Sequence, residues 1–497
     1  MIINPTEQTM LAIRSCLSSP IAKADTAGLQ QASGLQNYDL QPAAKLLYPI
    51  LTPLRNTTAR VKGNGGDSTH WKAILGVNVT NISMGVAEGR RNAVMVTRTQ
   101  PYNASYATIG LENSVTDEAI DSGEGFDDLR ALAAKNLLEA TIIGEEGVLL
   151  GGNYSLALGT TPTPTLSTAT TGGSLGNAQA ISVIAVALSY EGFQNASVAA
   201  GVPAVVTRNN ADGTQDTYGG GSARKSAAAT VTTGAGTTNT VSASVAPVPG
   251  AFAYAWFWGA AGSETLGDIT TLNSVVIKAA ATGTQLASAL PASDNSKNEL
   301  VFDGFLSQII AGGGYFHAMP TGTPGTGTGL TPDPAAGIVE FDDALRYIWD
   351  HYRTSPDEIL CNAQEIINVT RKIIAGGGAP LFRFNVDAQK GQVADVTLTA
   401  GAIVGQYLNK SAMNGGQLVN VKIHPNMPPG TVMFRKVTIP YPLSNVTNVA
   451  EVRYQRDYYQ TEWPRRTRAY EYGVYAREVL ALYAPFCFGV ITNIANA

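Results

Sequence analysis

Two glycine-rich stretches come closest to patterns that support catalysis or phosphate binding. Residues 172–176 read Gly-Gly-Ser-Leu-Gly, which fits the Gly-x-Ser-x-Gly pattern of a nucleophilic serine. That pattern needs a buried strand before the serine and a helix after it, whereas a Thr/Pro-rich stretch precedes it here. Residues 219–226 (GGGSARKS) are similar to a phosphate-binding loop, but Arg224 stands where its second glycine belongs. We therefore expect a linker at the first stretch and a hairpin turn at the second.

The histidines and cysteines form no metal-binding or disulfide pattern. They lie far apart in the chain: His70, His317, His351 and His424, and Cys16, Cys361 and Cys487. Each cysteine is expected to be a small buried apolar residue. With no set of nucleophile, base and orienting group, the sequence predicts that the protein is not an enzyme and has no cofactor and no metal.

Arginine and lysine residues are the remaining candidates for function. A cluster of three arginines close to two aromatic residues near the C-terminus could bind phosphate or stack on bases. The net charge of −5 argues against a dedicated nucleic-acid binder, so ion pairs with a neighbouring surface are the expected role. The candidate inter-subunit contact residues are Arg60, Lys62, Arg90, Arg91, Arg465, Arg466 and Arg468.

The composition leaves two classes of protein open. Of 497 residues, 44% are hydrophobic and only 14% are charged, against about 25% charged in ordinary soluble domains. A surface with few charges is suited to being covered by neighbouring subunits, and a Gly/Thr-rich β protein would have the same composition. The sequence shows no signal peptide and no apolar run long enough to cross a membrane.

The elements that must position these residues are organised around one long helix within residues 122–153. Acidic residues at 121–128 suit its start, and Gly144, Gly147 and then Gly151-Gly152 are expected to mark its exit. Apolar residues recur on one face at three- and four-residue steps: Phe126, Leu129, Ala133, Leu137 and Ala140.

The region before this helix is extended. Residues 1–60 read as an arm with one weak helix at 7–17. Residues 73–83 and 93–97 read as strands joined through Glu88-Gly89-Arg90-Arg91, which predicts a long two-stranded loop within 61–115. An isolated hairpin is marginally stable in water, so this loop is expected to need a partner surface.

The region after the helix changes character. Residues 160–180 read as a Thr/Pro/Gly linker, and 180–280 as short strands with no helix. Phe252, Tyr254, Trp256 and Trp258 alternate along one strand, as expected for one face packed into a core. We predict an inserted β-sandwich of immunoglobulin-like type that is dispensable for assembly. Further predicted elements are helices at 299–310, 340–353 and 362–374, and strands at 355–360, 395–440, 449–461, 468–482 and 486–492.

The order of these parts resembles the tailed-phage major capsid proteins of the Hong Kong 97 type. The residues that carry the resemblance are Tyr48-Pro49-Ile50-Leu51-Thr52-Pro53-Leu54, Arg60-Val61-Lys62-Gly63, the spine Phe126–Gly152 and the ending Ala476–Ile494. The resemblance implies an α+β capsid fold. Its parts are an N-terminal arm (1–60), an E-loop (61–115), a spine helix and first part of the P-domain (116–160), the immunoglobulin-like insertion (180–280), an A-domain (300–430) and a second part of the P-domain (431–497).

The family implies a shell function. Its members assemble hexamers and pentamers into an icosahedral or prolate head that encloses double-stranded DNA, inside the host bacterial cytoplasm, and end as part of the virion. Implied partners are a scaffolding protein and a portal protein, and the family also allows a decoration protein. Some members cross-link an E-loop lysine, a role for which Lys62 or Lys72 would be available, but no matching motif is present. We predict no cross-link and no removal of an N-terminal segment.

Three alternatives stay open at this stage. An encapsulin-like compartment would share the fold and hold protein cargo. A β-rich phage tail protein or adhesin would also carry an immunoglobulin-like module, but the predicted central helices argue against it. A hydrolase that uses Ser174 ranks last, because the surrounding stretch lacks the strand and helix that its motif requires.

Overall fold

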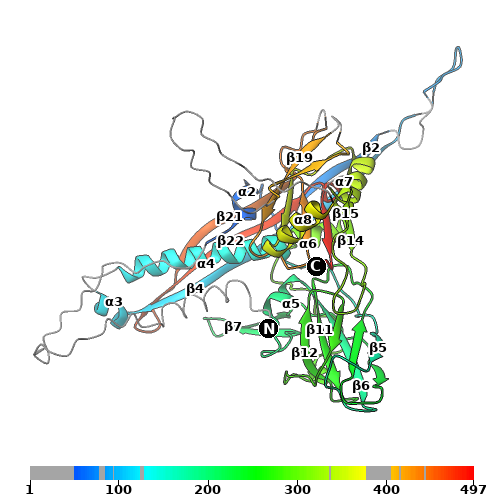
Figure 1. Cartoon of the computed structure of the whole chain (residues 1–497). Helices are drawn as coiled ribbons and strands as arrows, with labels where there is room; N and C mark the ends of the chain where they lie inside the picture. The colour runs from blue at the N-terminus through cyan, green and yellow to red at the C-terminus, as the bar shows by residue number, and fades with distance from the viewer. Residues whose placement is uncertain are drawn as a thin grey trace, which may run out of the picture.

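The computed structural model describes residues 50–77, 84–92, 94–123, 128–334, 337–376, 404–412, 416–441 and 444–496. Its body is elongated, with a long helix beside one sheet, a second sheet next to them and a separate β layer below (Figure 1). The predicted arm at 1–49, with its weak helix at 7–17, lies outside the described residues. No helix in the described part of the chain is long and apolar enough to cross a membrane.

A four-stranded sheet and helix α4 (Leu129–Gly151) form the extended part of the body (Figure 1). The strand order is β1-β21-β22-β4, with β1 parallel to β21 and the other neighbours antiparallel. The strand bounds are β1 Ala59–Lys62, β4 Ala107–Thr116, β21 Ala450–Glu462 and β22 Ala469–Leu482. The two long strands predicted near the C-terminus are therefore confirmed.

Helix α4 begins at Leu129, later than the predicted start near residue 122, and ends at Gly151, within the predicted glycine-marked exit. The carboxylate of Asp128 caps it by accepting hydrogen bonds from two backbone N–H groups of the first turn, both at 3.1 Å. The first two glycines of that exit, Gly144 and Gly147, lie inside the helix. Leu149 and Leu150 beyond them are fully buried in the main core. This burial outweighs the helix penalty of about 1 kcal/mol for each glycine.

The buried face of α4 differs in part from the predicted one. Leu137 is buried as predicted, whereas Ala140 is exposed and Phe126 lies outside the described residues. The buried face continues through Thr141 and Glu145, two polar residues that an apolar pattern does not detect. In the described part of the chain, two short helices precede α4: α2 (Pro53–Thr57) and α3 (Asp117–Gly123).

Strands β2 (Ser68–Val77) and β3 (Thr97–Ser105) form an antiparallel hairpin that leaves the body at one end (Figure 1). The predicted two-stranded loop is confirmed, but its second strand lies at 97–105 and not at 93–97. At the base, the ring of Trp71 stacks on Tyr102 at 5.9 Å and meets Tyr483 edge-on at 5.3 Å. These aromatic contacts fix the hairpin to the end of β22.

A mixed six-stranded sheet forms the second layer, in the order β14-β23-β20-β17-β19-β18. Its strands are β14 Tyr315–Ala318, β17 Glu358–Cys361, β18 Gln406–Asn409, β19 Gln417–Ile423, β20 Val432–Arg435 and β23 Gly489–Thr492. The neighbouring helices are α6 Phe305–Ala311, α7 Val339–Tyr352 and α8 Ala363–Ala375. The helices predicted at 340–353 and 362–374 are confirmed, whereas the one predicted at 299–310 begins only at 305. Short elements nearby are β15 Pro332–Asp333, β16 Gly337–Ile338 and the 3₁₀ turn Pro485–Cys487.

Alternation along the central strands separates two cores. Leu360 and Met433 point into the core that also contains residues of α4 and α6. Their neighbours Ile359 and Phe434 point into the core that contains residues of α7 and α8. The sheet is thus buried on both faces, which explains why its central strands read as continuous apolar runs.

Two antiparallel sheets form a separate sandwich, β12-β11-β6-β9 facing β13-β10-β5. The bounds are β5 Thr165–Ala169, β6 Ala180–Leu188, β9 Ala229–Thr232, β10 Thr240–Ser244, β11 Ala253–Gly259, β12 Thr265–Thr270 and β13 Ser274–Ile277. Tyr254, Trp256 and Trp258 fill the core between the sheets, as predicted. Phe252 instead packs in the main core of the body.

The sandwich corrects three predictions. Strand β5 lies within the stretch predicted to be a linker, so the sandwich begins before residue 180. The region predicted to contain no helix also contains a helix, α5 (Tyr190–Asn195). Further elements outside the two sheets are the hairpin strands β7 (Val205–Asn209) and β8 (Gln215–Gly219) and the 3₁₀ turn Ala287–Ala289. When its seven strands are numbered in chain order, one sheet has the strand order 6-5-2-3 and the other 7-4-1. The sheets of an immunoglobulin constant domain have the strand orders 1-2-5-4 and 3-6-7. The predicted β-sandwich is therefore present, but its strands are connected differently from those of an immunoglobulin domain.

The two motif-like stretches have structural roles. Residues 172–176 lie in the loop between β5 and β6, and Ser174 donates to the carbonyl of Lys278 at 3.1 Å. A strand and not a helix follows this serine, so the loop is no nucleophile elbow. Residues 219–226 form no hairpin turn, because Ser222 bridges Leu188 and Asn295. A Cβ at Gly221, where φ is +94°, would lie 2.2 Å from a backbone nitrogen, so only glycine permits this close approach.

Candidate functional site

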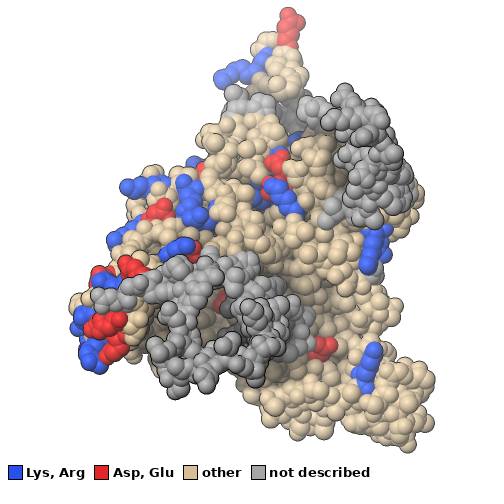
Figure 2. Space-filling view, turned by 60° about the vertical axis from the view of Figure 1, so that its left-hand side comes forward, with Lys and Arg blue, Asp and Glu red and all other residues tan. Residues whose placement is uncertain are grey.

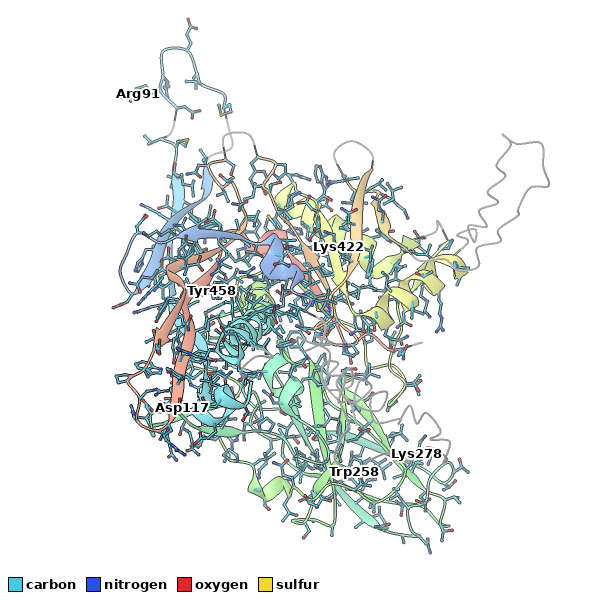
Figure 3. All side chains as sticks on the ribbon, turned by 90° about the vertical axis from the view of Figure 1, so that its left-hand side faces the viewer. Arg91, Asp117, Trp258, Lys278, Lys422 and Tyr458 are labelled. Atoms are coloured by element: carbon cyan, nitrogen blue, oxygen red, sulfur yellow. The ribbon has the colours of Figure 1, made fainter. Side chains whose placement is uncertain are left out.

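A cluster of charged residues lies where β1 meets α4 and the two long C-terminal strands. Arg60 Nη2 lies 2.6 Å from Glu478 Oε2 and 2.7 Å from Asp457 Oδ1, and its Nη1 donates to Glu145. Tyr458 donates its hydroxyl to the second oxygen of Glu145, and Figure 3 shows this tyrosine beside the helix. The side chains of Glu145 and Glu478 are fully buried. We refer to these five residues as the Arg60 cluster.

Burial dominates the electrostatics of the Arg60 cluster. Loss of hydration raises the pKa of Glu478 to about 8, with a further increase from the negative charge of Glu145 and an opposing effect of Arg60. Burial likewise raises the pKa of Glu145, although Arg60 opposes this effect. Burial alone would lower the pKa of Arg60, but the surrounding carboxylates outweigh it and raise that pKa. Arg60 therefore stays charged, while the carboxyl groups compete for a proton.

The next residue of α4 fixes the segment that precedes β1. Glu146 is fully buried and accepts hydrogen bonds from the backbone nitrogens of Leu54 at 2.9 Å and Arg55 at 2.8 Å. Both donors belong to the first turn of α2, whose N-cap residue Thr52 makes no side-chain cap. Glu146 thus takes the place of a capping residue from another element. Its Oε1 also contacts Nε2 of the buried His424 at 2.8 Å.

The β2–β3 hairpin presents a second kind of surface. Its outer part exposes large apolar side chains, with Ile74 exposed to 68%, Met84 to 80% and Val94 to 84%. Arg90 and Arg91 lie at its far end, and Figure 3 shows Arg91 away from the body. Apolar side chains at these exposures gain about 1.5–3 kcal/mol each when fully covered. The hairpin is therefore a surface suited to contact with another chain.

The opposite end of the body carries interspersed charges. Arg465 binds Asp117, and Arg468 binds Glu118, in exposed ion pairs within the chain. The guanidinium carbon of Arg465 also lies 3.7 Å from the centre of the Tyr470 ring. Acidic and basic side chains gather on this part of the body, whereas the visible face of the sandwich carries few (Figure 2). Exposed pairs of this kind contribute little to stability, so they are available for exchange with a neighbouring chain.

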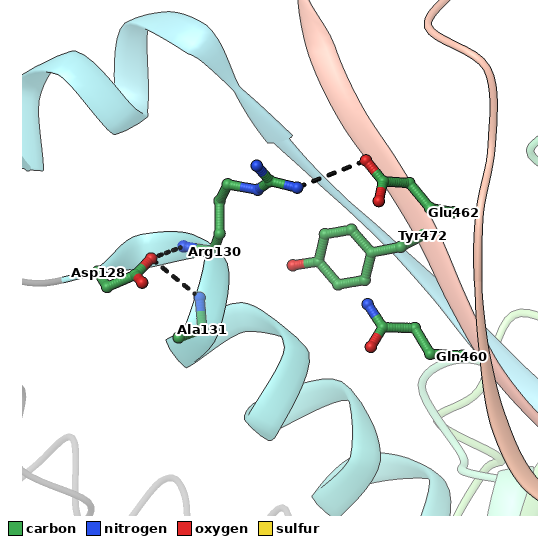
Figure 4. Close-up of a pocket in the computed structure, with 6 residues that line it drawn as sticks. All are labelled: Asp128, Arg130, Ala131, Gln460, Glu462 and Tyr472. Carbon is green, nitrogen blue, oxygen red and sulfur yellow. Dashed lines mark hydrogen bonds and ion pairs between the residues drawn. The ribbon is translucent and has the colours of Figure 1, made fainter.

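A polar pocket of about 280 Å³ lies near the start of α4 (Figure 4). Its lining residues are Asp128, Arg130, Ala131, Gln460, Glu462 and Tyr472. Arg130 pairs with Glu462 at 3.4 Å, and the carboxylate of Asp128 is occupied by the helix cap. These charges are largely satisfied by one another. Among the described residues, no group of three histidine, cysteine or acidic side chains is placed to hold a metal ion.

The structure separates the predicted contact residues into two groups. Arg60, Arg465 and Arg468 bind carboxylates of their own chain. The side chains that are exposed without belonging to those pairs are Lys62, Arg90, Arg91 and Arg466. Contact of any of the seven with another subunit stays a prediction.

Sequence reasoning missed three acidic residues that hold the body together. Glu145 and Glu146 interrupt the apolar stretch TIIGEEGVLL of α4, and a charged pair in such a stretch signals buried partners. Glu478 lies in a strand rich in alternating apolar residues, where its charge gives the same signal. Cys361 and Cys487 are buried and unpaired, as expected, and Cys16 lies outside the described residues.

No protein-family model matches the sequence, and no curated protein matches it. Solved structures with a similar course of the chain include the capsid of cyanophage A-1(L), with 12% identity, a TM-score of 0.42 and coverage of 93% of this chain and 98% of that chain. The capsid of the Myoviridae phage XM1 has 7% identity, a TM-score of 0.40 and coverage of 94% and 100%. The SrpI encapsulin of Synechococcus elongatus has 9% identity, a TM-score of 0.40 and coverage of 92% and 94%. The similar structures thus include phage capsids, the kind of protein that the sequence resembles, together with an encapsulin.

Proposed function

We propose that this chain is a major capsid protein of a tailed bacteriophage, of the Hong Kong 97 type. In this proposal β2 and β3 form the E-loop, α4 is the spine helix, and the four-stranded sheet belongs to the P-domain. The six-stranded sheet with α7 and α8 is the A-domain, and the sandwich is an insertion between them. Copies assemble into hexamers and pentamers of a head that encloses double-stranded DNA.

The exposed hairpin is the observation that carries the proposal. Ile74 of β2 and the residues Met84 and Val94 of the connection between β2 and β3 are more than two-thirds exposed. The hairpin contacts the body near its base, where Trp71 meets Tyr483. An isolated hairpin is marginally stable, and such apolar side chains favour removal from water. A second copy of the chain would cover them and fix the hairpin in the same step.

The placement of the surfaces favours rings over paired dimers. The β2–β3 hairpin lies at one end of the elongated body and α3 at the other (Figure 1). The acidic partners of Arg465 and Arg468 belong to α3. Contacts between two different surfaces are heterologous, and they generate closed rings when the rotation between copies closes. Hexamers and pentamers are rings of this kind.

The charge balance agrees with a container for DNA. A net charge of −5 provides no basic face for counterion release, so DNA would be enclosed without sequence-specific binding. Within this proposal, assembly uses a separate scaffolding protein and a portal protein, takes place in the host cytoplasm and yields a virion component.

Negative-stain electron microscopy of the protein, expressed alone and with a co-expressed scaffolding protein, tests the proposal. Wild-type protein should give closed angular shells or rings of six and five copies. Val94→Asp should reduce shell yield at least tenfold and leave the monomer folded, because this side chain is 84% exposed. Val205→Asp is the matched control, since Val205 is 50% exposed on β7 in the sandwich region and should leave the yield unchanged.

Two results would contradict the proposal. A well-behaved monomer or a trimeric fibre under both expression conditions would exclude the shell and favour the tail or adhesin alternative. Shells purified from infected cells that contain protein cargo and no DNA would favour an encapsulin-like compartment.

A further inference from the structure

The Arg60 cluster contains more acidic groups than its basic groups can neutralise. Glu145, Glu478 and Asp457 contact one guanidinium, that of Arg60. Among the described residues, the one other cation paired with these carboxylates is Arg55 of α2, whose Nε lies 3.6 Å from Glu145. Asp457 is largely hydrated at 45% exposure, but the two glutamates are fully buried. Two ionised carboxylates sharing a buried site repel each other strongly.

The hydrogen bonds indicate where a proton resides. Both oxygens of Glu145 accept a donor, one from Arg60 and one from Tyr458. In Glu478, Oε2 accepts from Arg60, whereas the buried Oε1 has no donor in the described part of the chain. The same guanidinium contacts both carboxyl groups, so the two acids lie next to each other in the buried site. A proton on Glu478 would remove one of the two negative charges from this site.

We propose that Glu145 and Glu478 share one proton, and that its loss in alkaline solution releases β1 and α2 from the body. The release follows from the connections of the pair. Glu145 belongs to α4, Glu478 to β22, and the guanidinium between them to β1. Without the proton, repulsion between α4 and β22 opens the site that holds Arg60. This device acts within one chain and does not depend on the proposed shell function.

The other groups that face the pair leave the direction of this response unchanged. The surrounding carboxylates raise the pKa of Arg60, so this guanidinium stays charged. The other charged groups are Arg55, at 3.6 Å from Glu145, and Asp457, whose side chain is 45% exposed. The ring of Tyr454 lies 5.9 Å from the guanidinium of Arg60. The pKa of Glu478, raised to about 8, agrees with a proton that is kept at neutral pH and lost above it. Below this pH, β1 and α2 stay bound to the body. Above it, the population of molecules in which they are released increases by up to about tenfold per pH unit.

Limited trypsin digestion of the unassembled full-length protein, followed by mass spectrometry, tests the proposal. Cleavage after Arg55 and Arg60 reports release of the segment that contains α2 and β1. Cleavage after the exposed Arg90 and Arg91 corrects for the change of trypsin activity with pH. Between pH 7 and 9.5 the rate of cleavage after Arg55 and Arg60, divided by the rate after Arg90 and Arg91, should rise at least tenfold in wild-type protein. In Glu478→Gln, where an amide replaces the protonated acid, the ratio should change less than twofold.

Two further variants and one spectrum keep the test decisive. Asp457→Asn removes an exposed carboxylate from the same arginine and should leave the alkaline rise in place. Tyr458→Phe removes a donor to ionised Glu145, so the rise should move to higher pH. Infrared difference spectra should show a protonated carboxyl band that disappears at alkaline pH and is missing in Glu478→Gln. A flat wild-type ratio, or a rise that persists in Glu478→Gln, would overturn the proposal.

Discussion

Replacing Glu146 should detach α2 from the spine helix. This carboxylate is fully buried and accepts hydrogen bonds from the backbone nitrogens of Leu54 and Arg55 and from His424, at 2.8–2.9 Å. A buried donor left without a partner costs about 1–3 kcal/mol. Glu146→Ala leaves two such donors in α2, the backbone nitrogens of Leu54 and Arg55, so α2 should be destabilised by roughly 2–6 kcal/mol. Glu146→Gln keeps one carbonyl oxygen and should cost roughly half as much.

Hydrogen exchange of the peptide that contains residues 50–58 measures this effect directly. A loss of about 3 kcal/mol corresponds to an increase of roughly 100-fold in the open population, and exchange of Leu54 and Arg55 should accelerate by that factor. Lys135→Gln is the control on the same helix, because the side chain of Lys135 is 62% exposed and pairs with Glu139 at 3.7 Å. Such pairs contribute at most about 1 kcal/mol. If Glu146→Ala exchanged at the wild-type rate, the capping role assigned to this residue would be wrong.

Three further outcomes can be checked by urea titration with fluorescence detection. Trp256→Ala should lower the free energy of unfolding by roughly 3–5 kcal/mol, because the ring is fully buried and Nε1 donates to Thr270 at 2.8 Å; Trp256→Phe is the milder control. Asn493→Gly should lower the free energy of unfolding by roughly 2–4 kcal/mol, because it removes hydrogen bonds to Asn273 at 3.1 Å and Met319 at 2.6 Å. Glycine tolerates the positive φ of +62° at this position. A decrease below 0.5 kcal/mol would show that these hydrogen bonds do not stabilise the fold. For Glu478, the folded state keeps a proton that the unfolded state loses. Wild-type stability should therefore fall from pH 4.5 to about 8, by up to about 1.4 kcal/mol per pH unit, whereas Glu478→Gln should lack this contribution.

Elements with a strong local pattern could be predicted from the sequence. The alternation of Tyr254, Trp256 and Trp258 indicated a strand with one face in a core, and the structure confirms it. Asn362 before an amphipathic run indicated the start of α8, where its side chain caps the helix. In these cases the local preference and the tertiary packing agree.

Features set by distant contacts could not be predicted in the same way. Of the four glycines expected to mark the exit of the helix, Gly144 and Gly147 lie inside it, because the leucines that follow them enter the main core and nothing local shows this. The strand order of the sandwich depends on pairings between segments far apart, such as β5 with β10. An apolar pattern reports which faces are buried, and it does not report which strands lie side by side.

Charged residues show the same limit at the candidate site. Arg60 was predicted to contact another subunit, since a lone arginine in an extended segment normally stays hydrated. Its partners, Glu145 and Glu478, lie 85 and 418 residues away in the chain. The sequence does not show that residues so far apart in the chain are in contact. Buried acidic residues in apolar elements do indicate that basic partners must exist.

The contacts of the sandwich bear on its expected dispensability for assembly. The backbone nitrogen of Asn273, in the turn between β12 and β13, donates to Asn493 at 2.8 Å, and Asn493 donates back to Asn273 at 3.1 Å. Asn493 directly follows β23, a strand inside the six-stranded sheet. Replacing the sandwich by a flexible linker would therefore leave a polar gap beside that strand, at a cost of about 1–3 kcal/mol for each buried group without a partner. A linker variant that fails to assemble could thus have lost body stability, and only a variant that keeps the Asn273 turn separates that effect from a direct role of the sandwich in the shell.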